Sequence, residues 1–96
     1  MATKQRLQSD AAIPPGELLQ EELEARGMTQ KLLAQMVGRP AQLISEICRG
    51  KKEITADTAL DLEKALGIPA YFWMNLEADY RLALARRRRQ DAGSDT

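Results

Sequence analysis

A chain of 96 residues, in which 14 lysine and arginine side chains balance 14 aspartate and glutamate side chains, has room for one domain with a modest core. Because the sequence has no histidine and a single cysteine, Cys48, we expect no internal disulfide, no metal site, no cofactor and no catalytic residues. No apolar stretch approaches the roughly 18 residues of a membrane span, and residues 1–12 lack the apolar centre of a signal peptide, which indicates a cytoplasmic protein without membrane contact.

An all-α fold is expected, because aliphatic residues dominate the apolar part of the sequence and long β-branched runs are absent. The first helix opens after Pro14 and Pro15, since proline in a first turn loses no hydrogen bond, and it ends at Gly27. Its apolar face carries Leu18, Leu19 and Leu23, and its opposite face carries Glu17, Glu21, Glu22 and Glu24.

The second helix is marked at both ends. Thr29 is a suitable N-cap, because its hydroxyl group can accept a hydrogen bond from a backbone N–H of the first turn, and Gly38 ends the helix. Three apolar residues have the spacing of a buried face: Leu33, Met36 and Val37.

Three more helices follow. One runs from about Pro40 to Arg49 and stops at Gly50. The next is capped by Thr55, contains Leu62 and Leu66, and is closed by Gly67. A fifth helix follows Pro69 and is expected to run to about Arg87.

The segment 29–50 is the most informative part of the sequence, because only Gly38, Arg39 and Pro40 separate its two short helices. So short a turn forces the helices to cross steeply. The crossing requires a small residue, a glycine with a left-handed backbone, and branched residues that anchor the second helix in the core. The residues that fit these requirements, in that order, are Ala34, Gly38, Ile44 and Ile47.

The helix after this turn has two distinct faces. Its apolar stripe consists of Leu43, Ile44, Ile47 and Cys48, and its polar stripe consists of Gln42, Ser45, Glu46 and Arg49. Glutamine suits adenine edges, arginine suits guanine, and glutamate accepts from cytosine. We interpret the polar stripe as a DNA-reading surface, with an ordinary solvated helix face as the alternative.

The run GMTQKLLAQMVGRPAQLISEICRGKKEIT resembles the helix-turn-helix of the Xre/Cro family of repressors. The flanking runs IPPGELLQEELEARG and TADTALDLEKALGIPAYFWMNLEADYRL resemble the HigA branch, antitoxins of HigBA toxin-antitoxin modules that are also called virulence-associated protein I. The resemblance implies a five-helix, lambda-repressor-like domain. We place this DNA-binding domain, with its C-terminal helix, at residues 13–85, between a flexible tail at 1–12 and a basic helix end with a flexible tail at 86–96.

The resemblance further implies a homodimer that binds a palindromic operator in its own promoter, represses its operon, and neutralises a toxin of the RelE-like ribonuclease class. It matches Gln30 with a phosphate contact, and it matches Gln42, Ser45 and Arg49 with exposed groove positions. Charge and proximity add Arg39, Lys51 and Lys52. The expected set of DNA-binding residues is completed by Thr29, Pro40, Ala41 and Glu46.

The fifth helix carries an apolar stripe near i, i+4 spacing: Phe72, Trp73, Leu76, Tyr80 and Leu84. Reading a palindrome requires two-fold symmetry, so we expect part of this stripe to form the dimer contact, with the domain core as the alternative. Two roles are possible for the basic run Arg86–Arg89: a solvated helix end, or a contact with phosphate or an acidic partner.

Three other functions are kept as alternatives. A stand-alone or phage-like regulator would lack a toxin gene beside its own. A protein-interaction module without DNA binding would fit the neutral net charge and the glutamate at position 46. An enzyme is disfavoured, because the sequence has no glycine-rich phosphate loop and no nucleophile–base pair.

Overall fold

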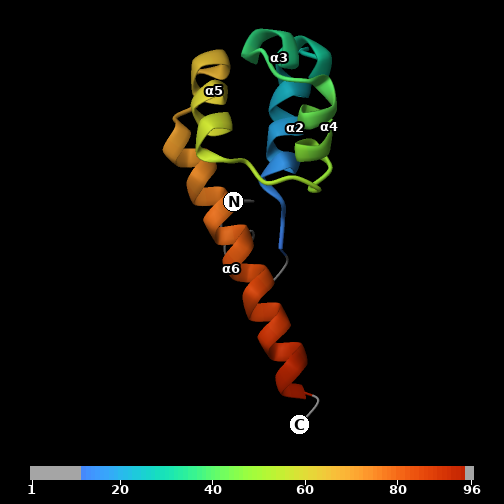
Figure 1. Ribbon diagram of the computed structural model, residues 1–96, viewed down its shortest axis with the longest axis vertical. Helices are drawn as coiled ribbons and strands as arrows, with labels where there is room; N and C mark the ends of the chain where they lie inside the picture. The colour runs from blue at the N-terminus through green and yellow to red at the C-terminus, as the bar shows by residue number, and fades with distance from the viewer. Residues whose placement is uncertain (1–11, 95–96) are drawn as a thin grey trace.

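The computed structural model describes residues 12–94, and within that range the chain forms helices and no strand (Figure 1). The helices are α2 (Pro15–Ala25), α3 (Gln30–Val37), α4 (Ala41–Cys48), α5 (Ala56–Leu66) and α6 (Ala70–Ser94). The predicted all-α, five-helix fold is confirmed. The tail expected at residues 1–12 lies outside the described residues, apart from Ala12, as do residues 95 and 96.

The local signals at the helix ends act as the sequence predicts. The Thr29 hydroxyl oxygen accepts a hydrogen bond from the Leu32 backbone N–H at 3.0 Å, and the Thr55 hydroxyl oxygen accepts one from the Thr58 N–H at 3.3 Å. Gly38 ends α3 with a φ of 68°, a left-handed conformation that costs other residues about 1–2 kcal/mol. The turn between α3 and α4 therefore depends on this glycine.

Helix α6 is longer than the sequence analysis predicts. The expected end near Arg87 is wrong, because the helix continues to Ser94. Arginine, glutamine and alanine are good helix formers, and no proline interrupts the segment. At 1.5 Å per residue, a helix of 25 residues is about 37 Å long, and Figure 1 shows its C-terminal half projecting beyond the other helices. Within residues 12–94, no helix combines the length and apolar character needed to cross a bilayer.

All five helices contribute to one hydrophobic core. Trp73 is the largest fully buried side chain, and Ile54, from the loop between α4 and α5, is also buried. The remaining buried apolar residues are Leu19, Leu23, Leu33, Ala34, Ile44, Ile47, Cys48, Ala59, Leu62 and Leu66. The core therefore joins the two helices of the predicted helix-turn-helix to α2, α5 and α6.

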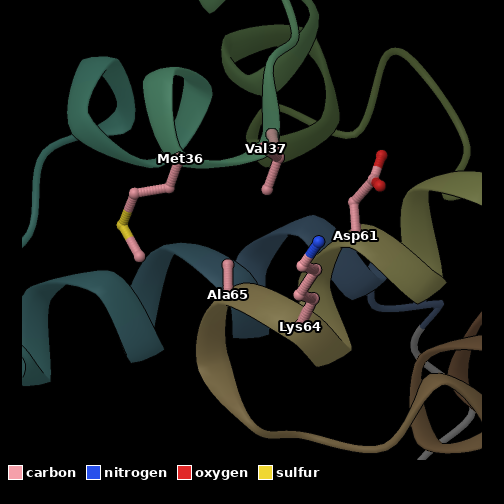
Figure 2. Close-up of a pocket in the computed structure, with 5 residues that line it drawn as sticks. All are labelled: Met36, Val37, Asp61, Lys64 and Ala65. Atoms are coloured by element: carbon pink, nitrogen blue, oxygen red, sulfur yellow. The ribbon is translucent and has the colours of Figure 1, made fainter.

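Three residues expected on buried faces lie further out, and one of them, Val37, is half-buried against the core. The prediction that Met36 is buried is wrong: the residue is 51% exposed, because Leu33 and Ala34 occupy the inner face of α3. Figure 2 shows Met36 and Val37 on α3 facing Asp61, Lys64 and Ala65 on α5 across a hollow that these five residues line. Leu18 is half-buried rather than buried.

Helices α2 and α4 lie in close contact at Gly16. A Cβ atom added there would lie 1.6 Å from the Ile47 carbonyl oxygen and 2.9 Å from the Cys48 Cα atom. Both contacts are with backbone, which cannot rotate away as a side chain can. The position of α4 on the domain therefore requires glycine at residue 16.

We expect Gly16→Ala to destabilise the fold by about 3 kcal/mol or more, because α2 and α4 must move apart. The matched control is Gly27→Ala, where φ is +67° and the added Cβ meets nothing within 4 Å, and this variant should cost about 1 kcal/mol. Urea unfolding followed by circular dichroism measures both values. Equal destabilisation by the two variants would contradict the close packing of α2 on α4.

Candidate nucleic-acid interface

Helix α4 has an inner and an outer face. Ile44, Ile47 and Cys48 are buried, and Leu43 is partly buried against the same core. On the outer face, Gln42 and Arg49 are exposed, whereas Ser45 and Glu46 are half-buried. The structure therefore places the four residues of the polar stripe together on the surface, as the helical spacing predicts.

Glu46 is the one acidic residue of this outer face. Its carboxylate accepts a hydrogen bond from the Gln42 side-chain amide at 3.4 Å, one turn earlier in α4. This bond orients both side chains along the helix but leaves the negative charge in place. A DNA surface would therefore meet one anion at the centre of the stripe, unless a cytosine amino group donates to it.

The start of α4 offers backbone groups rather than polar side chains. Pro40 is the N-cap residue, with φ −62° and ψ 140°, and supplies no side-chain hydrogen bond, and Ala41 follows it as the first helical residue. Both residues are exposed. A helix N-terminus carries partial positive charge and suits a phosphate group, so this end of α4 fits a contact with the DNA backbone.

Exposed cations follow the other end of α4. Arg49 is the C-cap residue, and Lys51 and Lys52 lie in the next loop, where their backbone N–H groups donate to the Glu46 carbonyl oxygen at 2.8 and 3.3 Å. Residues 39–53 carry a surplus of two positive charges, whereas residues 17–24 carry four glutamates and no cation. The region around α4 is therefore locally basic, although the net charge of the whole chain is zero.

Arg39, in the turn between α3 and α4, is already paired. Its Nε and Nη2 atoms both lie 2.8 Å from Asp61 Oδ2 on α5, and both side chains are about one-third exposed. The pair links the turn to α5 and partly neutralises the cation. The sequence analysis missed Asp61, because 22 residues separate the partners and helical spacing gives no signal across that distance.

Thr29 and Gln30, at the start of α3, also have partners within the domain. The Thr29 hydroxyl group serves as the helix cap, and the half-buried Gln30 amide donates to Gln20 Oε1 on α2 at 2.8 Å. Gln20 is a second partner that the sequence analysis missed. A phosphate contact by Gln30 would use the part of its amide that this bond leaves free.

The apolar stripe of α6 divides between core and surface. Trp73 is fully buried and belongs to the core, which was the alternative for this stripe. Phe72 is 37% exposed and packs edge-on against Trp73, with ring centroids 5.5 Å apart. Leu76, Tyr80 and Leu84 are half-buried, and the arginines at 86–89 are exposed further along the helix.

Comparison with known proteins extends the likeness to most of the chain. Residues 19–73 match the helix-turn-helix family. The chain is 40% identical to virulence-associated protein I of Dichelobacter nodosus, over 82% of this chain and 74% of that protein. It is 36% identical to antitoxin HigA-1 of Vibrio cholerae, over 79% and 72% respectively. The structure of Pseudomonas aeruginosa antitoxin HigA with the higBA promoter superposes with a TM-score of 0.80 and 32% identity, over 85% of this chain and 90% of that one.

The Cys48 thiol, on the inner face of α4, is expected to react slowly with alkylating reagents. Burial raises the pKa of the Cys48 thiol from 9.0 to about 11, so at pH 8 the thiolate population falls about a hundredfold. We expect iodoacetamide to label Cys48 at pH 8 at least about a hundredfold more slowly in the folded protein than in urea. The control places Gln42→Cys in a Cys48→Ala background, where labelling should be fast in the folded protein. Fast native labelling of Cys48 would show that this face is not buried.

Proposed function

The chain belongs to the Xre/Cro type of helix-turn-helix proteins, in the branch of HigA antitoxins, and we propose that it binds an operator in its own promoter and represses its operon. The observation that carries this proposal is the polar stripe of α4, whose opposite face is held in the core. A short helix with one face anchored and the other displayed can enter the major groove, where base edges carry distinct donor and acceptor patterns.

The proposed DNA contacts fall into two groups. Gln42, Ser45 and Arg49 face outward from α4 and are assigned to base edges, with Pro40 and Ala41 contributing shape at the helix start. The surrounding residues Thr29, Gln30, Arg39, Lys51 and Lys52 are assigned to the phosphate backbone. Backbone contacts set orientation and affinity, whereas base contacts set sequence preference, so the two groups predict different defects when they are removed.

We further propose that the protein acts as a homodimer through α6. Its partly exposed residues Phe72, Leu76, Tyr80 and Leu84 form one stripe, and the C-terminal half of the helix projects beyond the body of the domain (Figure 1). A two-fold axis near this helix would relate two copies of α4. Recognition helices about 34 Å apart would read half-sites one DNA turn apart.

The proposed protein partner is a toxin of the RelE-like ribonuclease class, which the protein would neutralise in the cytoplasm. Support for a toxin partner comes from the relatives, which are named as antitoxins. The protein's own role is binding rather than catalysis in this proposal. The sequence has no histidine, Cys48 is buried with a raised pKa, and residues 12–94 contain no cluster of three potential metal ligands.

A gel-shift titration against the protein's own upstream DNA and a scrambled duplex tests the repressor proposal. Wild type should prefer its own DNA and lose affinity steeply as salt rises, because phosphate contacts release counterions. The Gln42→Ala, Arg49→Ala double variant should lose at least about tenfold of the preference between the two duplexes, since each base contact discriminates by about 1–3 kcal/mol.

The matched control removes the same two residue types from the far end of α6, as Arg88→Ala with Gln90→Ala. Both residues are exposed there, and the preference for the upstream DNA should stay at the wild-type value. The repressor proposal is wrong if folded wild type binds no upstream fragment at low salt. The assignment of base contacts to α4 is wrong if both double variants lose the preference equally.

A further inference from the structure

Glu77, on α6, is a buried charged residue whose partners come from two different parts of the chain. It is 6% exposed, and its Oε1 atom accepts a hydrogen bond from the Ile54 backbone N–H at 2.9 Å. Its Oε2 atom lies 2.8 Å from Arg81 Nε, one turn later in α6. Burying a carboxylate is costly unless it is paired and hydrogen-bonded, and both conditions are met here. Both carboxylate oxygens of the buried Glu77 side chain therefore have a partner.

The Ile54 N–H group needs an acceptor that the local chain does not provide. Ile54 lies between α4 and α5, and its hydrogen bond to Glu77 is buried. An unpaired buried backbone N–H costs about as much as a lost hydrogen bond. Its side chain, 1% exposed, is anchored in the core, whereas the carboxylate of Glu77 sets the direction of its peptide group. Glu77 therefore controls how the chain enters α5.

The loop that this bond holds is the one that carries Lys51 and Lys52. At its start, the Glu46 carbonyl oxygen accepts from the N–H groups of both lysines. At its end, the anchors are the buried Ile54 side chain and the hydrogen bond to Glu77. Between these anchors, Lys51, Lys52 and Glu53 are exposed. The loop is thus fixed at both ends, with one of the ties coming from α6.

We propose that Glu77 is a positioning residue for DNA binding, which orients the loop after α4 so that Lys51 and Lys52 meet the phosphate backbone. The inference rests on the proposed function, and it adds a residue that touches no DNA. Glu77 also links α6, the proposed dimer helix, to the loop after α4 that carries Lys51 and Lys52. Arg81 extends the link, since its guanidinium lies 5.2 Å from the centroid of the Tyr80 ring on the proposed dimer stripe.

The first test compares Glu77→Leu with Glu77→Gln. Leucine preserves side-chain bulk but accepts no hydrogen bond, whereas the amide oxygen of glutamine can still accept from Ile54 and loses the charge that pairs with Arg81. Hydrogen exchange of the Ile54 amide should be fast in Glu77→Leu and protected in Glu77→Gln. Affinity for the upstream DNA should fall about fivefold in Glu77→Leu, which corresponds to the net contribution of one ordinary hydrogen bond. It should recover in Glu77→Gln. Arg81→Met removes the ion pair with Glu77 and the contact with the Tyr80 ring but keeps the hydrogen bond from Ile54, so the Ile54 amide should stay protected in this variant.

The second test asks whether Glu77 acts through the lysines. The Glu77→Leu change is repeated in a Lys51→Ala, Lys52→Ala background. The two lysine substitutions should themselves reduce the slope of log affinity against log salt concentration, by the amount expected for the loss of about two phosphate contacts. If Glu77 positions these lysines, its removal should cause no further loss of affinity there. An equal fivefold loss in both backgrounds would overturn the inference, and so would unchanged binding by Glu77→Leu in the wild-type background.

Two results separate the positioning role of Glu77 from the repressor function. If folded wild type binds no upstream DNA, the repressor proposal and the role of Glu77 both fall. If wild type binds and responds to Gln42→Ala with Arg49→Ala but not to Glu77→Leu, the positioning role alone is wrong.

Discussion

Burial of Ile44 and Ile47 sets the orientation of α4 on the domain. These residues hold one face of an eight-residue helix in the core, and so determine which face remains at the surface. The close approach of α2 at Gly16 limits how far α4 can shift without losing that contact. A helix this short has little stability of its own, so its orientation comes from packing. The proposed reading surface is in this sense a product of the core.

Local signals in the sequence account for most of the fold. The caps at Thr29 and Thr55, the left-handed Gly38 and the two-faced pattern of α4 were all predictable, because each depends on residues within about one helical turn. The same local reasoning misjudged Met36, whose burial depends on which side of α3 meets its neighbours. It also ended α6 too early, since strong helix formers continue past the point where the apolar stripe stops.

The contacts that tie the site together could not be predicted from the sequence. Arg39 pairs with Asp61, Ile54 with Glu77, and Arg26 donates to the Leu66 carbonyl oxygen across 40 positions. Helical periodicity describes one element at a time and gives no information on which elements meet. Glu77 nevertheless had a weak signal, as an acidic residue next to the apolar stripe of α6 and four positions before an arginine. The first two contacts join the turn before α4 to α5 and the loop after α4 to α6, and the third joins the end of α2 to α5.

An NMR titration of the labelled protein with its own upstream duplex shows, residue by residue, whether the outer face of α4 reads DNA. If α4 reads DNA, the largest changes in backbone amide shifts should occur at Gln42, Ser45 and Arg49, with smaller changes at Lys51 and Lys52. A scrambled duplex should shift the lysines but not the three groove residues. Changes confined to α2 or to the far end of α6, with α4 unaffected at saturation, would contradict DNA reading by α4.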